Sequence, residues 1–186
     1  MTAIAAVVSN GLIWMGGDSL GSHPSGISHL GLTKIWKEHK GNSTWLFGCA
    51  GAMAYLQALR YEVELPAETP GANTCEYIIR AWAKSVREHL QQKRPDLVDK
   101  DGNVRGNSQV LIGLNGQLFI MVGFAVYPIP QPYAAIGEGG SAAYGVLHFI
   151  HRRPSGIRPK AQLRHALQAA DDRFSSVGGD YKFLHV

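Results

Sequence analysis

Thr2 carries two groups that could act together as a catalytic unit if the initiator Met1 is removed. Its hydroxyl would be the nucleophile, and its free α-amine would accept the hydroxyl proton. An α-amine has an ordinary pKa of roughly 7.7–8.0, so part of it is neutral and basic near pH 7. Residue 2 therefore supplies a nucleophile and a base, provided that the fold brings suitable partners to it.

The first partner is brought by a predicted β-hairpin at the start of the chain. Asn10-Gly11 is a strong two-residue turn signal, and the apolar segments 2–8 and 12–15 on either side are predicted strands. With these two residues as the turn, Asp18 falls opposite Ala3. The carboxylate is thus expected beside the nucleophile.

A second predicted hairpin brings two more partners. The strands 34–37 and 44–47 flank a polar turn, and their register places Lys34 opposite Cys49 and next to Gly48. Packing the two hairpins together would gather all the partners at one end of the structure.

These residue types suit attack on a carbonyl group. A Lys34 ammonium near the Thr2 amine disfavours a second positive charge, and so lowers the pKa of the amine. Asp18 can hold that ammonium by a charge-assisted hydrogen bond. Gly48 has no Cβ, so a substrate backbone could approach it, and its N–H is a candidate donor to the oxyanion of a tetrahedral intermediate.

This pattern resembles the proteasome β-subunit family of N-terminal nucleophile hydrolases, which includes a small bacterial heat-shock peptidase that docks onto an ATP-driven unfoldase ring. The matching segments are Thr2-Ala3-Ile4-Ala5, Gly16-Gly17-Asp18, Lys34-Ile35 and Phe47-Gly48-Cys49-Ala50-Gly51. Near the C-terminus, Asp172 and Ser175 resemble the family's Asp-x-x-Ser, whose side chains hydrogen-bond around the threonine.

The resemblance implies a threonine endopeptidase subunit that cleaves peptides or unfolded proteins and needs no cofactor or metal. It further implies a homo-oligomeric ring, stacked as two rings, with an ATP-driven unfoldase as a candidate partner. By the same resemblance, Ser22 and the Gly48–Ala50 backbone would bind the peptide as an added strand. Leu46 and Ala50 would line an apolar specificity pocket.

Glu138 stands where the resembling family has a serine close to the threonine amine. A carboxylate there would stabilise the ammonium form of the amine and raise its pKa. Two alternatives are that Ser141 supplies the hydroxyl or that Glu138 points away. A retained Met1 would convert the amine into an amide. The alternative function is therefore a catalytically silent or weak scaffold subunit of a ring.

Two rival motifs compete with this interpretation. Gly17-Asp18-Ser19-Leu20-Gly21 matches a nucleophile elbow with Ser19 as nucleophile, but the helix-breaking segment 22–26 follows where that motif needs a helix. Asp99-Lys100-Asp101-Gly102-Asn103 faintly resembles a calcium loop, but the glutamate at loop position 12 is missing, so a plain turn is expected.

The composition is consistent with one globular domain spanning residues 1–186. The net charge of +4 is mild and no basic run stands out, which argues against nucleic-acid binding. No apolar run is long enough to span a membrane, and no signal peptide is evident. Cys49 and Cys75 have no metal-like spacing, so both are expected to be buried thiols in a cytoplasmic protein.

The remaining pattern predicts an α+β chain. Strands are expected at 109–114, 117–122, 133–137 and 182–186, and helices at 50–64, 73–93, 141–152 and 159–174. The strand 133–137 is expected to be the last strand of the sheet that holds 109–122. Two antiparallel sheets packed face to face, each covered by a helix pair, would bury these faces as a four-layer αββα sandwich, which is also the fold that the resemblance implies.

Overall fold

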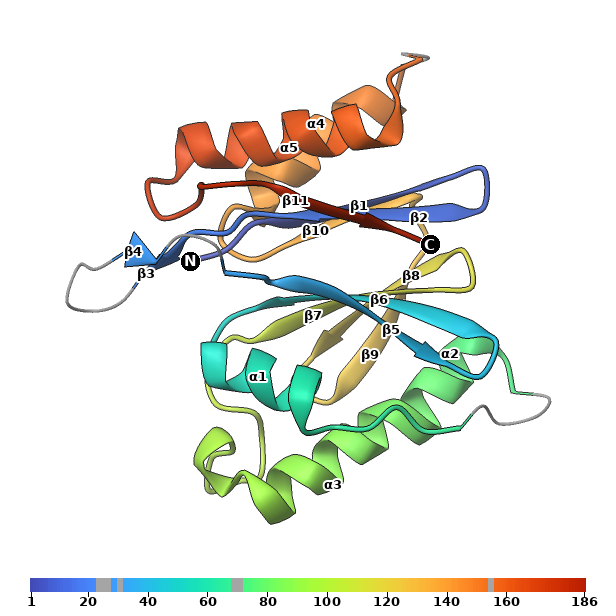
Figure 1. Cartoon of the computed structure of the whole chain (residues 1–186), viewed down its shortest axis with the longest axis vertical. Helices are drawn as coiled ribbons and strands as arrows, with labels where there is room; N and C mark the ends of the chain where they lie inside the picture. The colour runs from blue at the N-terminus through green and yellow to red at the C-terminus, as the bar shows by residue number, and fades with distance from the viewer. Residues whose placement is uncertain (23–27, 30–31, 68–71, 154–155) are drawn as a thin grey trace.

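Two antiparallel sheets lie face to face, and helices cover the outer face of each (Figure 1). This computed structural model describes all residues except 23–27, 30–31, 68–71 and 154–155. The layers run helix, sheet, sheet, helix, so the predicted four-layer α+β sandwich is confirmed.

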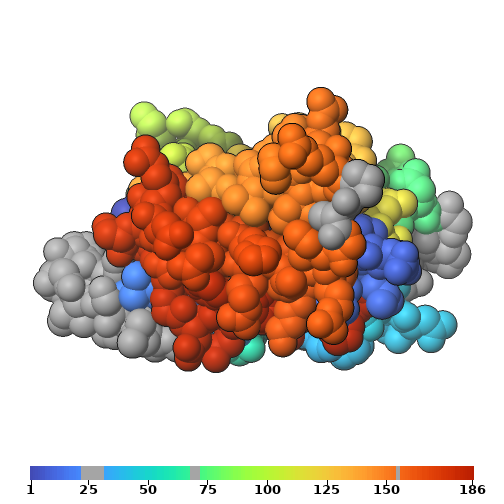
Figure 2. Space-filling view, turned by 90° about the horizontal axis from the view of Figure 1, so that it is seen from above, coloured from blue at the N-terminus to red at the C-terminus, as the bar shows by residue number. Residues whose placement is uncertain are grey.

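The first sheet has the strand order β10-β1-β2-β11. Its strands are β1 (Ile4–Ser9), β2 (Leu12–Gly17), β10 (Tyr133–Ile136) and β11 (Lys182–His185). Its outer face is covered by α4 (Gly140–His151) and α5 (Pro159–Arg173), which lie side by side over it when the molecule is seen from above (Figure 2).

The second sheet has the order β5-β6-β7-β8-β9. Its strands are β5 (Ile35–Lys40), β6 (Ser43–Ala50), β7 (Gln109–Leu114), β8 (Gln117–Val122) and β9 (Ala125–Ile129). Helix α1 (Met53–Tyr61) covers it together with one long helical stretch, made of α2 (Thr74–Tyr77), a π-helical segment (Ile78–Ala83) and α3 (Lys84–Lys93). A 3-10 turn (Pro95–Leu97) follows, and a separate two-stranded sheet pairs β3 (Gly21–Ser22) with β4 (Ser28–His29).

Both hairpins have the predicted register. Ile4 pairs with Gly17 in the first, and the turn residues Asn10 and Gly11 have φ angles of 51° and 78°, as a type I′ turn requires. In the second hairpin Ile35 pairs with Gly48. The register follows from turn chemistry that is local in sequence, and this is why it could be predicted.

The strand at residues 133–136 lies in the other sheet from the one predicted. It pairs with β1 through Ala135 and Ala5 at the edge of the first sheet, and it does not continue the strands 109–122. The place beside β8 is taken by β9, a strand that was not predicted and that contains Pro128. Proline is tolerated there because β9 is an edge strand.

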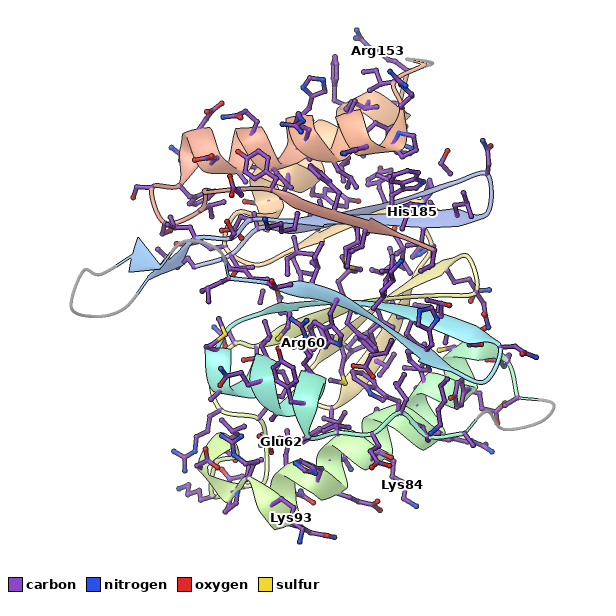
Figure 3. All side chains as sticks on the ribbon, in the orientation of Figure 1. Arg60, Glu62, Lys84, Lys93, Arg153 and His185 are labelled. Atoms are coloured by element: carbon purple, nitrogen blue, oxygen red, sulfur yellow. The ribbon has the colours of Figure 1, made fainter. Side chains whose placement is uncertain are left out.

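Apolar side chains fill all three interlayer spaces, while charged side chains such as Lys84, Lys93 and Arg153 project outward (Figure 3). The space between the sheets holds Ile4 and Met15 from the first sheet and Leu46 from the second. Among the described residues, no helix is both long enough and apolar enough to cross a membrane. The strand ends that meet at one end of this sandwich carry the predicted site.

Candidate active site

Lys34 and Asp18 form a buried ion pair at the end of the sandwich. The Nζ atom of Lys34 lies 2.8 Å from each carboxylate oxygen of Asp18. Lys34 is 3% exposed and Asp18 is 1% exposed. Burial lowers the pKa of Lys34 below its ordinary range, and the nearby Asp18 carboxylate opposes that shift. The pair is therefore the predicted one, and it is shielded from water.

Asp18 is held in place by the backbone as well. The Ala3 N–H donates to its Oδ1 atom at 2.9 Å, and the Gly178 N–H donates to Oδ2 at 3.3 Å. The carboxylate thus connects the first residues of the chain, the end of β2 and the loop after α5. Gly178 was not assigned to the site by sequence reasoning, although the pair Gly178-Gly179 after a predicted helix signals a special backbone position.

Thr2 sits directly beside this pair. The Lys34 Nζ atom donates to the Met1 carbonyl oxygen at 2.8 Å, and bond lengths then place Nζ no more than about 5.4 Å from the Thr2 nitrogen. Thr2 is only 7% exposed. In this chain the Thr2 nitrogen is part of the Met1–Thr2 amide, so the base forms only when Met1 is removed.

A glycine turn between β10 and α4 packs against Thr2. The Gly139 N–H donates to the Thr2 carbonyl oxygen at 3.1 Å. Gly137 has a φ of +87°, and a Cβ built on it would collide with that same carbonyl group. Only glycine fits at residue 137, because both the backbone conformation and the close approach exclude a side chain.

A pocket of about 540 Å³ opens at Thr2. It is lined by Met1, Thr2, Ala50, Gly51, Asn107, Gln109, Gly137 and Glu138. The Gln109 side-chain oxygen accepts a hydrogen bond from the Gly137 N–H at 3.1 Å, so this amide fixes the glycine turn from the β7 side. A cavity with polar walls therefore meets the candidate nucleophile.

Glu138 faces this pocket and does not point away from it. Its Oε2 atom accepts a hydrogen bond from the Ser176 hydroxyl at 3.2 Å. Burial lowers the pKa of the Met1 amine, and nearby Lys34 lowers it further, while the Asp18 and Glu138 carboxylates oppose the shift. Ser141, the alternative hydroxyl, is exposed on α4 and is not among the residues that line the pocket.

Two predicted residues near the C-terminus are not among the residues that line the pocket at Thr2. Asp172 is exposed and accepts a hydrogen bond from Gln168 at 2.9 Å, and Ser175 is also exposed. The preceding carboxylate, Asp171, packs against Gly178 and accepts a hydrogen bond from the Tyr181 hydroxyl at 2.7 Å. The following hydroxyl, Ser176, is the one that reaches Glu138.

The predicted substrate-binding residues are only partly brought together. Ala50 lines the pocket. Leu46 is fully buried between the sheets, and a Cβ on Gly48 would meet Ile4 Cγ2 at 2.7 Å, so the missing side chain of Gly48 makes room for the core. The apolar wall expected from Leu46 is therefore absent from the pocket. Ser22 lies in β3, paired with Ser28 of β4.

Neither rival motif gains support. Ser19 is 0% exposed, and its backbone N–H donates to the Gly178 carbonyl at 3.1 Å, so it is enclosed and is not presented on a strand–helix elbow. The Asp99 carboxylate accepts hydrogen bonds from the N–H groups of Asp101 and Asn103, both at 2.9 Å, as in a plain turn. The described residues contain no cluster of His, Cys, Asp and Glu that could hold a metal ion.

No family model and no curated protein sequence matches this chain. Solved structures do resemble it. A complex of Thiobacillus denitrificans BPH with epoxomicin is 19% identical with a TM-score of 0.77, covering 100% of this chain and 98% of that chain. HslV from Trypanosoma brucei is 15% identical with a TM-score of 0.71, and the match covers 99% of this chain and 98% of that chain. An Anbu mutant from Hyphomicrobium sp. strain MC1 is 15% identical with a TM-score of 0.75, and the match covers 98% of this chain and 80% of that chain. The chain thus has the fold of the HslV-like and Anbu subunits, the N-terminal nucleophile hydrolase sandwich of the proteasome β type.

Proposed function

We propose that this chain is a threonine-type endopeptidase subunit of a self-compartmentalising, proteasome-like complex, and that it cleaves peptide bonds with the Thr2 hydroxyl after Met1 is removed. The observation that carries the proposal is the contact of Lys34 with both Asp18 and the Met1 carbonyl oxygen, all at 2.8 Å. A buried cation is thereby held at the carbonyl group that is bonded to the Thr2 nitrogen.

The residues support a two-step acyl transfer. The neutral Thr2 amine accepts the hydroxyl proton as Oγ bonds to the substrate carbonyl carbon, and the carbonyl oxygen takes the negative charge. When the C–N bond breaks, the amine returns the proton to the leaving nitrogen, and an ester to Thr2 remains. Water, deprotonated by the same amine, then attacks this ester and releases the acid and Thr2.

Lys34 and the end of β6 provide the electrostatics of these steps. The Lys34 ammonium disfavours protonation of the neighbouring amine and so keeps a fraction of it available as a base. We assign the oxyanion donor to a backbone N–H of the segment from Gly48 to Gly51, at the end of β6. Gly48 is the donor expected from the sequence, and Gly51 lines the pocket.

A silent scaffold subunit is the second candidate function, and two observations favour it. The Met1 carbonyl oxygen accepts a hydrogen bond from Lys34, and the Glu138 carboxylate opposes the lowering of the pKa of the Met1 amine. The mass of the intact protein from its native host distinguishes the two functions, because catalysis requires the loss of Met1.

We also propose that copies of the chain assemble, as a ring or as two stacked rings, and enclose Thr2. One neighbour of this fold, from Pseudomonas aeruginosa, is described as a helical assembly of the Anbu complex, and it is 18% identical with a TM-score of 0.70. Enclosure would limit cleavage to unfolded chains that enter the chamber. An ATP-driven unfoldase remains a proposed partner.

The test uses protein that begins at Thr2, produced by cleaving an N-terminal fusion at that residue. We expect it to hydrolyse fluorogenic peptides and to gain the mass of one epoxomicin, the compound bound to the Thiobacillus denitrificans neighbour. Protein with Met1 retained and a Thr2→Ala variant should do neither. Equal hydrolysis by the Thr2→Ala protein would refute the assignment of the nucleophile.

A further inference from the structure

Glu138 is the one side chain with a formal charge at pH 7 among the described residues that line the pocket at Thr2. The other side chains of the pocket are neutral, and Asn107 and Gln109 contribute amides. Lys34 and Asp18 lie buried beside the pocket and neutralise each other. Among its side chains the pocket therefore presents one charge, the Glu138 carboxylate, which lies near the terminal amine.

The backbone fixes where this charge lies. On one side of Glu138, the Gly137 N–H is held by Gln109 at 3.1 Å. On the other side, the Gly139 N–H is held by the Thr2 carbonyl oxygen at 3.1 Å. Both neighbours of Glu138 are thus attached to the walls of the pocket, so its side chain starts from a fixed point next to Thr2.

The carboxylate itself is held from a second direction. Ser176 donates to it at 3.2 Å, and Ser176 lies two residues before Gly178, whose N–H binds Asp18. The Ser176 contact connects the glycine turn to the loop after α5. A carboxylate has about four acceptor sites, so one hydrogen bond leaves it free to accept others from a ligand.

We propose that Glu138 selects peptides that place a lysine or arginine side chain in this pocket. The inference rests on the proposed function, because it assigns the substrate class of the same site. A cationic side chain matches the charge of this carboxylate, and its N–H groups can also donate to the amide oxygens of the wall. An apolar side chain would shield the carboxylate from water without replacing its hydrogen bonds, which is unfavourable.

This selectivity replaces the apolar preference expected from the sequence. That expectation needed Leu46 as a pocket wall, and Leu46 is 0% exposed in the core between the sheets. Because Glu138 is exposed to solvent, the gain is that of a surface ion pair, about a two- to fivefold difference in affinity. The gain should shrink as salt screens the charges.

The experiment measures binding, so it does not depend on turnover. Two fluorescein-labelled peptides, identical except for a central Lys or Met, are titrated by anisotropy into full-length Thr2→Ala protein that lacks Met1. The same titrations are made with added Glu138→Gln, Ser176→Ala or Glu64→Gln substitutions. Glu64→Gln is the matched control, since Glu64 is exposed and does not line the pocket.

We expect the Lys peptide to bind about two- to fivefold more tightly than the Met peptide at about 50 mM salt, and the difference to fall at about 500 mM. Glu138→Gln should abolish the difference. Glu64→Gln should preserve it, and Ser176→Ala should preserve most of it because the charge remains. Equal affinity for the two peptides, no binding of either, or an unchanged preference in Glu138→Gln overturns the inference. Failure of the proposed function shows separately, as a lack of cleavage by protein with an intact Thr2.

Discussion

The Lys34 ammonium lies 2.8 Å from both oxygens of the Asp18 carboxylate, and the same nitrogen donates to the Met1 carbonyl. One buried cation therefore connects β2, β5 and the N-terminal segment. The ion pair has two roles in this arrangement. It holds the two sheets together at the end of the sandwich, and it sets the electrostatics around the Thr2 nitrogen.

Removal of either partner should destabilise the fold as well as the site. We expect Lys34→Ala to lower the free energy of unfolding by about 3–5 kcal/mol, because it leaves the Asp18 charge buried without a counter-ion. Loss of activity in this variant would therefore be accompanied by loss of stability. Urea denaturation followed by circular dichroism measures the change.

Two further variants identify the cause of that loss. Lys84→Ala removes a lysine that is 67% exposed and should change stability by no more than about 0.5 kcal/mol. The double variant Asp18→Asn with Lys34→Met should be less destabilised than the sum of its single variants, because no buried charge remains. Strict additivity of the two substitutions would show that the pair is not coupled.

Thr2→Ala should abolish peptide hydrolysis while leaving the fold intact. The change removes a hydroxyl and a methyl group from a side chain at the rim of the pocket, and the backbone contacts of Thr2 to Gly139 are kept. Steady-state cleavage of a fluorogenic peptide measures the loss, and thermal unfolding serves as the control. Thr2→Ser, which retains a hydroxyl nucleophile, should keep measurable activity if the mechanism is correct.

Gly137→Ala should impair both stability and catalysis. The φ of +87° costs an alanine about 1–3 kcal/mol, and its methyl group would also displace the Thr2 carbonyl. Gly145→Ala is the matched control, because nothing lies within 4 Å of a Cβ built there. In the interior of α4 that alanine should stabilise by about 1 kcal/mol. Similar effects of the two substitutions on peptide cleavage would contradict the role of the glycine turn.

Cys49 should weaken the fold at alkaline pH. Burial raises the pKa of its thiol from 9.0 to about 12. The unfolded chain therefore loses this proton near pH 9.0 while the folded chain keeps it, so stability falls as the pH rises from 9.0 towards 12. One such group contributes a slope of at most about 1.4 kcal/mol per pH unit. Urea unfolding at several pH values should show a shallower alkaline loss for Cys49→Ala than for the parent protein.

The two cysteines should also differ in reactivity. A thiol reagent reacts with the thiolate of an accessible cysteine. Cys75 is partly exposed, so the expectation from the sequence that both cysteines are buried is wrong for this one, whereas Cys49 is buried. We expect a colorimetric thiol reagent to label one cysteine in folded protein and two in denaturant. Rapid labelling of both in the folded state would argue against the burial of Cys49.

The parts of the site that depend on local signals could be predicted from the sequence. Asn10-Gly11 fixes the register of the first hairpin, and this register alone places Asp18 beside Ala3. The pairing of Lys34 with Asp18 followed from their opposite charges, once both hairpins placed them at one end of the structure. These two predictions needed only the type of turn and the charges of the two side chains.

The parts that depend on distant contacts could not be predicted in the same way. Strand 133–136 carries no signal that it pairs with β1 rather than with β8, because that choice is made between strands far apart in the chain. In a helix, successive side chains point about 100° apart, so neighbouring carboxylates have different surroundings that a sequence motif does not distinguish. Asp171 and Asp172 illustrate this, since the first packs on Gly178 and the second is exposed.

Assembly is the last prediction. Helix α1 buries Tyr55, Leu56 and Leu59 within its own domain, so its apolar face is not free to contact another copy. Exposed apolar side chains are found at Tyr127 on the edge strand β9 and at Phe149 on α4, which are 55% and 60% exposed. An edge strand and an apolar helix face are surfaces on which copies of a chain commonly meet.

We therefore expect a particle of several chains, each of 20.2 kDa, with Thr2 on an enclosed surface. Light scattering coupled to size exclusion measures its mass, and electron microscopy distinguishes a closed ring from a helical assembly. Tyr127→Ser and Phe149→Ser should shift the mass towards the monomer if these side chains lie at interfaces, whereas a substitution at exposed Glu64 should not. A stable monomer at micromolar concentration would contradict compartmentalisation, because an open Thr2 site would then be accessible to any unfolded chain.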